Sequence, residues 1–360
     1  MRRIKKCTVF LLVLCLLLNL AGCAAAQKPL RVTLVLKTVT EVAEFWGTLL
    51  SGVEKAAEEY GVELKVLTSP REIDIDKQIE LIRQVTADKP DVMILSAADY
   101  DRCAEATEEA IAAGIGVVAI DTDVNAAGRA CFVGSNSYEI GLEMGRAMAS
   151  YLPEGGKVAV IQHMLTTTTG IERTRGVLDA LNEAGNIEIL GSFCCDNSTE
   201  QAQTITTELL SADPEIRGFV CTNEVCNVGA ANALVELGMG GRVYVVGCDN
   251  SQRQIQFLEQ NIIQAIVTQR PFNMGYVAVQ QAVRVANGEQ TDDFPFPVLL
   301  QDAKPVVEYL PGWQCDISGA RRWEDLPEAA RSYVEYVEKA IGCPIGYVSV
   351  GAERESLILR

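Results

Sequence analysis

Short apolar segments alternate with amphipathic segments along most of the chain after residue 30. The run 30–37 (LRVTLVLK) is apolar and of strand length, whereas residues 45–60 carry apolar side chains three or four positions apart. The first pattern predicts a buried strand and the second a helix with one apolar face. The same alternation predicts further strands at 62–67, 91–96, 117–120, 157–162, 187–190, 218–222 and 243–247. Strands that alternate with helices are typical of parallel sheets covered on both faces.

One strand pattern occurs twice. Residues 117–121 (VVAID) and 243–249 (VYVVGCD) are each an apolar strand followed by an aspartate, and each comes after a strand that ends in small or polar residues. The repetition predicts two copies of one α/β lobe. Because ligands of open parallel sheets bind beyond the carboxyl ends of the strands, we expect Asp121 and Asp249 to point into a cleft between the lobes.

The first 22 residues have the pattern of an export signal. Four basic residues within the first six positions precede an apolar run at 7–18, which is short for a transmembrane helix. The run leads into Leu20-Ala21-Gly22-Cys23, which resembles the bacterial lipobox, in which the cysteine is lipidated after cleavage. We therefore expect a signal peptide at 1–22, a lipidated Cys23 that anchors the protein to the cell membrane, and a tether at 23–29. The alternative is an ordinary signal peptide with an incidental cysteine.

The length and the net charge of the chain limit the domain organisation and the partners that we expect. A chain of 360 residues suits two lobes of roughly 100–150 residues better than one domain. The formal net charge of −17 argues against nucleic acid as a partner, because binding to phosphates needs lysine and arginine side chains. We expect no segment of the mature chain to span a bilayer.

The sequence offers little enzyme chemistry. His163 is the only histidine, and neither a GxxxxGK[ST] phosphate loop nor an HExxH motif is present. Seven cysteines lie in the body of the chain: Cys103, Cys131, Cys194, Cys195, Cys221, Cys226 and Cys248. Their odd number and the lack of a CxxC pair favour buried free thiols over a zinc site or a disulfide framework. We expect no metal, no cofactor and no catalytic residue, and free thiols suggest a reducing habitat.

A series of segments over about residues 30–302 resembles one known family. The segments, in chain order, are 45–53, 89–92, 113–121, 134–136, 141, 173–176, 222–223, 245–249 and 268–275. Together they resemble the ribose/galactose type of periplasmic binding proteins, the substrate-binding components of ABC importers. The resemblance implies an α/β fold with two Rossmann-like lobes, each a doubly wound parallel sheet, joined by a three-segment hinge.

The resemblance also implies where the lobes divide. The chain would cross between them near 134–135, 269–270 and 298–299. The N-terminal lobe would then hold residues 30–134 and 270–297, and the C-terminal lobe residues 135–269 and 298–302.

Seven residues match ligand-binding positions of that family. The resemblance implies that Asp121 and Asp249 accept hydrogen bonds from sugar hydroxyls and that Arg173 donates hydrogen bonds to sugar oxygens. The amides and the aromatic pair complete the set: Asn223, Gln269, Phe45 and Trp46. The mixture suits a polyol, since every hydroxyl that loses its water in a closed cleft needs a new partner.

Some positions depart from the family pattern or have simpler explanations. Thr122 stands where the family has a second arginine, and Asn197 and Cys248 stand where ribose binders often have aromatics, which puts ribose in doubt. The alternatives for the matched residues are helix caps for the two aspartates, a solvated helix position for Arg173, a turn at Gln269 and a core position for Trp46.

The expected function is therefore capture of a small polar, sugar-like ligand by a monomeric, extracytoplasmic protein, and delivery to an ABC permease. The alternative is a sensor that passes its signal to a histidine kinase or chemoreceptor.

Residues 303–360 resemble a different protein. The segments 304–319, 326–331 and 344–354 are similar to the C-terminal end of adenylosuccinate synthetase, although the phosphate loop of that enzyme is absent. We expect a fused fragment, with purine-synthesis activity as a remote alternative. Its helix, about 327–341, carries the apolar stripe Ala330, Tyr333, Val337 and Ile341, and we expect it to pack poorly because its original partner is missing.

Overall fold

The computed structural model describes residues 28–297, 299–301, 310–341, 343–351 and 356–360. The expected signal peptide, the lipidation site Cys23 and nearly all of the tether lie outside this range. The chain divides into two compact units, Met1–Lys304 and Pro305–Arg360, and each is described by itself. Among the described residues, no helix combines the length and apolar character needed to cross a bilayer.

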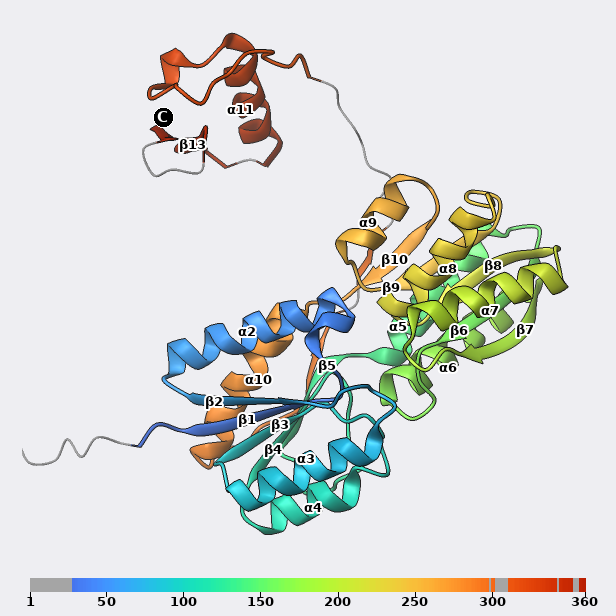
Figure 1. The fold of residues 1–360 in the computed structure, drawn as a ribbon, viewed down its shortest axis with the longest axis vertical. Coiled ribbons are helices and arrows are strands. Elements are labelled where there is room, and N and C mark those ends of the chain that lie inside the picture. Colours follow the sequence, from blue (N-terminus) through green and yellow to red (C-terminus); the bar gives the residue numbers. More distant parts are fainter. Residues whose placement is uncertain (1–27, 298, 302–309, 342, 352–355) are drawn as a thin grey trace, which may run out of the picture. The chain divides into compact units, whose positions relative to one another are not determined.

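The first unit contains two sheets of six strands (Figure 1). In spatial order, the strands of the first sheet are β11 (Phe294–Phe296), β5 (Cys131–Ser135), β4 (Gly116–Ile120), β3 (Val92–Leu95), β1 (Arg31–Leu36) and β2 (Glu63–Thr68), all parallel. Those of the second are β12 (Leu299–Gln301), β10 (Ala265–Thr268), β9 (Tyr244–Cys248), β8 (Ile216–Cys221), β6 (Gly156–Gln162) and β7 (Ile187–Cys194). Only β12 in the second sheet is antiparallel.

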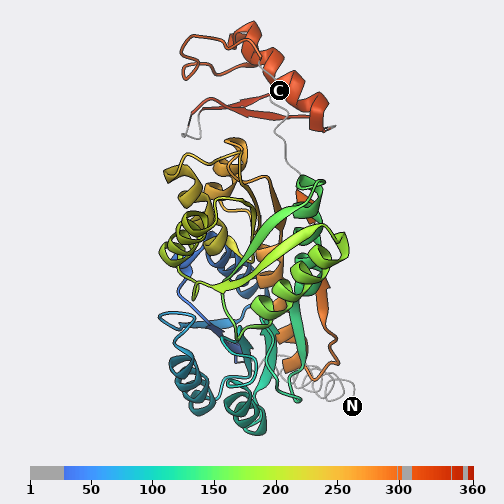
Figure 2. The same cartoon turned by 90° about the vertical axis from the view of Figure 1, so that its right-hand side faces the viewer.

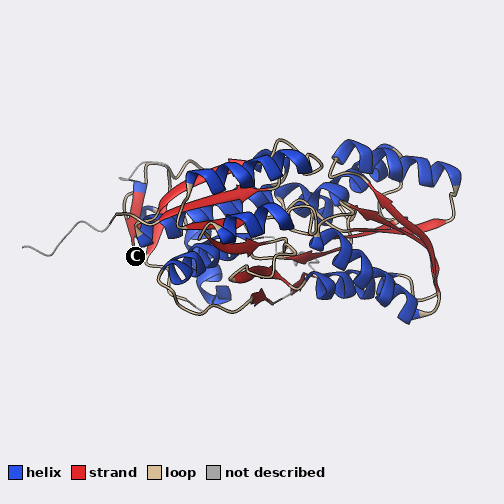
Figure 3. Cartoon of the chain, turned by 90° about the horizontal axis from the view of Figure 1, so that it is seen from below, coloured by secondary structure: helices blue, strands red, loops and turns tan. Residues whose placement is uncertain are grey.

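Helices cover both faces of each sheet, as the colouring in Figure 3 shows. The helices on the first sheet are α2 (Glu44–Tyr60) and α10 (Pro271–Ala286) on one face and α3 (Ile75–Asp88) and α4 (Ala104–Ala112) on the other. The helices on the second sheet are α5 (Ser137–Tyr151) and α6 (Thr168–Ala184) on one face, with α7 (Thr199–Ala212), α8 (Glu224–Glu236) and α9 (Gln252–Glu259) on the other. A short 3-10 helix, η1 (Thr40–Val42), precedes α2.

This architecture confirms the α/β fold class of two parallel-sheet lobes. Each predicted strand overlaps an observed strand. The largest difference is at β7, which runs to Cys194 although the pattern predicts an end at Leu190. The apolar pattern of β7 is weak because it is an edge strand whose side chains are only half-buried.

The chain passes between the two sheets three times (Figure 2). The first passage follows β5 and leads into α5, and the second follows β10 and leads into α10. The third lies between the short strands β11 and β12, which pair with different sheets. Three connections between two separately packed lobes are the covalent basis for hinge motion.

The second unit has a small core of its own. It contains η2 (Trp323–Asp325), α11 (Glu328–Ile341) and an antiparallel pair, β13 (Tyr347–Ser349) and β14 (Leu357–Leu359). Buried residues of the core are Ala320, Leu326, Ala330 and Ile358. The core is small, and Trp313, Tyr347 and Leu359 remain exposed, so the expectation of poor packing stays a prediction. Ala330 of the predicted stripe is buried, but Tyr333 is 47% exposed and Val334 is buried instead, so the buried face of α11 follows the predicted stripe only in part.

Candidate functional site

A small cavity lies where the carboxyl ends of the two sheets face each other. Its lining contains all seven predicted ligand-binding residues: Phe45, Trp46, Asp121, Arg173, Asn223, Asp249 and Gln269. Lys37, Ala43, Glu72, His163, Thr169, Asn197, Glu224 and Val225 complete it. Its free volume is about 30 Å³, far below the roughly 300–1,000 Å³ of typical ligand pockets. The side chains themselves fill the site, and most of their polar atoms bind one another.

The two aspartates occupy equivalent positions in the two lobes. Asp121 follows β4 and Asp249 follows β9, and both adopt left-handed backbone angles, with φ of 60° and 77°. The N–H of Asp121 donates to the carbonyl of Val133, and the N–H of Asp249 donates to the carbonyl of Val267, each on the next strand. The repeated sequence pattern thus corresponds to a repeated turn that directs one carboxylate from each sheet into the cavity.

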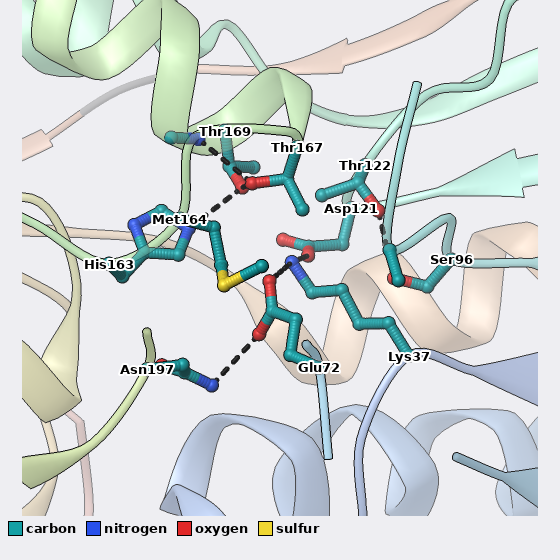
Figure 4. A network of polar contacts seen from close by, with 12 residues as sticks. Lys37, Glu72, Ser96, Asp121, Thr122, His163, Met164, Thr167, Thr169 and Asn197 are labelled. Carbon is teal, nitrogen blue, oxygen red and sulfur yellow. Dashed lines mark hydrogen bonds and ion pairs between the residues drawn. The ribbon is translucent and has the colours of Figure 1, made fainter. Parts of the chain in front are cut away.

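A buried ion-pair cluster occupies the first-lobe side of the cavity (Figure 4). The ammonium of Lys37, which directly follows β1, lies 2.9 Å from the carboxylate of Glu72 and 3.5 Å from that of Asp121. It also lies 5.5 Å from the centroid of the Trp46 ring. Burial raises the pKa of Glu72, although Lys37 opposes this rise. Lys37 therefore supplies a positive charge to a site rich in carboxylates.

Hydrogen bonds between cavity residues join the two lobes. Asn197, which follows β7 in the second lobe, donates from Nδ2 to Oε2 of Glu72 at 2.8 Å. Its Oδ1 accepts a hydrogen bond of 2.9 Å from Nδ2 of Asn223. On the other side of the cavity, the N–H of Glu44 donates to Oε1 of Glu224 at 3.3 Å. The structure is therefore a closed arrangement that the site residues themselves help to hold.

Arg173 provides an inward-facing guanidinium. It lies in the second turn of α6, is 2% exposed, and donates from Nη1 to the carbonyl of Thr222 at 2.9 Å. Its Nε is buried and has no hydrogen-bond partner among the described residues. The glycine at 141 makes this placement possible, since a Cβ there would overlap the backbone carbonyl of Arg173. A solvated position for Arg173 is therefore wrong.

Asp249 and Glu224 form a carboxylate pair at the N-terminus of α8. One oxygen of Asp249 accepts from the N–H of Glu224 at 2.9 Å, and the other accepts from Nε2 of Gln269 at 2.7 Å. Burial, followed by repulsion from Asp249, raises the pKa of Glu224 to about 7. The cap of α8 is Asn223, whose Oδ1 accepts from the N–H of Cys226, so Asn223 supports the helix as well as lining the cavity.

Both members of the aromatic pair are buried and line the cavity. Phe45 and Trp46 are 9% and 5% exposed, and their rings pack edge to face with centroids 5.1 Å apart. They also belong to the core beneath α2. The core and cavity interpretations of Trp46 are therefore compatible.

His163 is buried and neutral. Its ring nitrogens lie 2.8 Å from the hydroxyl of Thr222 and 3.2 Å from that of Thr169. Burial, followed by the charges of Lys37 and Arg173, holds the pKa of His163 well below its ordinary value. Within the described ranges, no group of three or more His, Cys, Asp or Glu side chains could hold a metal ion.

Sequence reasoning missed several cavity residues, chiefly Lys37, Glu72, Thr169 and Glu224. Lys37 carried a usable signal, because it stands directly at the carboxyl end of β1, where open parallel sheets bind ligands. Glu72 carried no such signal, because it lies in the irregular segment between β2 and α3 and reaches the cavity only through tertiary folding.

The fold and site define a two-lobed protein of the type I periplasmic binding class. Residues 33–290 match the periplasmic binding protein domain, and the chain belongs to that family. The D-allose-binding periplasmic protein of Escherichia coli (strain K12) is 26% identical over 276 residues, 74% of this chain and 87% of the relative. A solved glucose-galactose binding protein from Geobacillus stearothermophilus superposes with a TM-score of 0.73 at 26% identity, over 78% of this chain and 99% of that one.

The second unit matches a different family. Residues 269–358 match adenylosuccinate synthetase. The enzyme from Pelobacter propionicus is 51% identical over 63 residues, which are 18% of this chain but only 15% of the enzyme. Both resemblances inferred from the sequence are therefore confirmed, and the chain spans a small part of the synthetase.

Proposed function

We propose that this protein captures a sugar or a sugar-like small polar ligand in the interlobe cleft and delivers it to an ABC importer. The observation that carries the proposal is the convergence of Asp121, Arg173, Asp249 and Gln269, from two sheets, on one buried cavity. The relative from Escherichia coli is a D-allose-binding protein, which supports the same ligand class.

The site chemistry suits a polyol. The carboxylates of Asp121 and Asp249 accept hydrogen bonds from hydroxyls, and Nε of Arg173, which has no partner in the described part of the chain, donates to an oxygen of the ligand. Hydrogen bonds to charged groups each contribute about 1.5–3 kcal/mol. Phe45 and Trp46 provide an apolar surface for the carbon face of the ring.

Lys37 takes over the role of the missing arginine in this proposal. Thr122 stands where the family has its second arginine, and its hydroxyl is buried against Ser96 and the carbonyl of Ala97. A cation nevertheless lies beside Asp121, because Lys37 reaches it from β1. Lys37 would thus bind a ligand oxygen that the arginine binds in the family pattern.

Binding requires the lobes to part, because the closed cavity is too small for a sugar ring. The ligand would replace the Asn197 to Glu72 bond and its neighbours when the lobes close around it. We propose that closure around ligand forms the surface that the permease recognises, and that the three passages between the sheets act as the hinge.

The test is ligand screening by thermal shift and isothermal titration calorimetry, using D-allose, D-ribose, D-galactose, other polyols and nucleosides. A true ligand at 100 times its Kd stabilises the protein by about 2.7 kcal/mol. Asp249→Asn should clearly reduce the shift at the same ligand concentration, and the exposed Asp292→Asn should retain it. The absence of any shift across the panel would contradict a sugar-like ligand.

We further propose that the mature protein is a monomeric lipoprotein anchored through Cys23. Radiolabelled palmitate should label the wild-type chain but not Cys23→Ala in a bacterial host. Permease and ATPase genes next to this gene would support import, whereas histidine-kinase genes would favour the sensor alternative.

We propose no enzymatic role for the second unit. It corresponds to about 15% of the synthetase relative, and the chain has no phosphate loop. Formation of adenylosuccinate from IMP, aspartate and GTP by the purified protein would overturn this.

A further inference from the structure

Two fully buried cysteine sulfurs touch each other behind the ligand cavity. Cys195, in the loop after β7, and Cys226, in the first turn of α8, have Sγ atoms 3.5 Å apart. Both residues are 0% exposed. A disulfide needs about 2.05 Å between sulfurs, so an approach of about 1.5 Å would allow the bond. The two residues are 31 positions apart and outside any CxxC motif, so the sequence gives no sign of the pairing.

We propose that Cys195 and Cys226 are a reversible redox-modification site, which forms a disulfide when the protein meets a small-molecule disulfide. The hydrogen bond from the Cys226 thiol lowers the pKa of Cys195, whereas burial raises the pKa of Cys226. Because Cys195 lies in the loop after β7 and Cys226 in the first turn of α8, we assign Cys195 as the first nucleophile and Cys226 as the second.

The reaction balances as two thiol–disulfide exchanges. The thiolate of Cys195 attacks one sulfur of the small disulfide, which releases one small thiolate and forms a mixed disulfide. Cys226 then loses its proton to solvent and attacks Sγ of Cys195, which releases the second small thiolate. The two protein thiols are oxidised by two electrons, and one small disulfide is reduced to two thiols.

Access to the sulfurs depends on the loop that follows β7. This loop includes Asn197, whose Nδ2 bonds to Glu72 of the other lobe. Parting of the lobes breaks this bond and leaves the loop with fewer restraints. The open protein should therefore oxidise faster than the closed one.

The disulfide would act directly on the ligand cavity. The N–H of Cys226 donates to Oδ1 of Asn223, and Nδ2 of Asn223 donates to Oδ1 of Asn197, which lies two residues after Cys195. Both cavity amides are thus attached to the segments that the new bond would draw together. Oxidation would shift Asn197 and Asn223, and so change the polar lining of the second lobe.

The test is peptide mapping of the purified protein before and after incubation with oxidised glutathione. We expect a tryptic cross-link to form between residues 176–217 and 218–242, with a mass two units below the sum of the two reduced peptides. Each of these peptides contains a second cysteine, Cys194 and Cys221. The cross-link should therefore survive in Cys194→Ser and Cys221→Ser, and disappear in Cys195→Ser and Cys226→Ser.

A stability measurement provides a second readout that needs no variant. The cross-link closes a loop of about 30 residues, so the melting temperature should rise by several degrees and return to its first value with dithiothreitol. Full alkylation of both cysteines after the glutathione treatment, a Cys194–Cys195 bond, or only a stable glutathione adduct would each overturn the proposal.

Discussion

Oε2 of Glu72 accepts a hydrogen bond of 2.8 Å from Nδ2 of Asn197, and this bond crosses from one lobe to the other. The other oxygen of Glu72 lies 2.9 Å from the ammonium of Lys37, so one side chain neutralises a buried cation and also joins the lobes. The stability of the closed form is therefore coupled to the electrostatics of the cavity.

Removal of this carboxylate should cost stability. In Glu72→Ala, Lys37 keeps only the 3.5 Å contact with Asp121 and loses its closest counter-charge. Breaking a buried ion pair by removing one partner costs about 3–5 kcal/mol. We expect a loss in this range in urea unfolding, and a more open protein in small-angle X-ray scattering.

The matched control for this variant is Glu80→Ala, which breaks the exposed pair of Glu80 with Lys77. Exposed pairs contribute about 0–1 kcal/mol, so its stability should be nearly that of the wild type. Equal losses for both variants would show that the buried cluster has no special role.

Ligand affinity should depend on the two charged groups that the proposal places against the ligand. Replacing Asp249 with Asn, or Arg173 with Gln, should each weaken the Kd of the ligand found in the screen by about 10- to 100-fold, because a charge-assisted hydrogen bond contributes about 1.5–3 kcal/mol. Calorimetry measures both. An unchanged Kd in either variant would remove that residue from the binding set.

The raised pKa of Glu224 predicts a dependence of stability on pH. Its pKa is about 7 in the folded protein against an ordinary value of 4.5, so between these limits the folded state holds a proton that the unfolded state has lost. Stability should therefore fall as the pH rises from about 4.5 to 7, by up to about 3 kcal/mol.

Glu224→Gln keeps the shape of the side chain but cannot ionise. The variant should match the wild type at pH 5 and exceed its unfolding free energy at pH 8, as measured by urea unfolding. The exposed Glu236→Gln on the same helix should follow the wild type at both values. If the unfolding free energy of Glu224→Gln depended on pH as strongly as that of the wild type, the pH dependence would arise from other groups.

The close approach of α5 and α6 should be sensitive to one methyl group. In Gly141→Ala, the new Cβ would overlap the carbonyl of Arg173, so the helices must separate. We expect a destabilisation of about 1–3 kcal/mol and weaker ligand binding, because the guanidinium moves with its helix.

In contrast to Gly141→Ala, we expect Gly47→Ala in α2 to stabilise the protein. A Cβ at Gly47 would meet no atom within 4 Å, so the helix should gain up to about 1 kcal/mol. Gly141→Ala with wild-type stability and affinity would contradict the packing argument.

The sequence by itself determined the architecture and the strand ends that carry the central acids. Apolar runs that alternate with amphipathic segments are a local signal, and so is the aspartate that follows β4 and β9. Because parallel strands align their carboxyl ends at one sheet edge, Asp121 and Asp249 could be assigned to a cleft without knowing any contact.

Only the tertiary structure decided which other side chains complete the cavity. Glu72 comes from an irregular segment, and its place beside Lys37 depends on how β2 and α3 pack against β1. The contact between Cys195 and Cys226 likewise exists because β7 ends and α8 begins at the same edge of the second sheet. In the second unit, the pattern suggested Tyr333 for the buried face of α11, but Tyr333 is exposed, whereas Val334 is buried and Ala330 lies in one core cluster with Ile358 of β14. Such contacts join residues that are distant in the chain, so they cannot be predicted from local patterns of hydrophobicity.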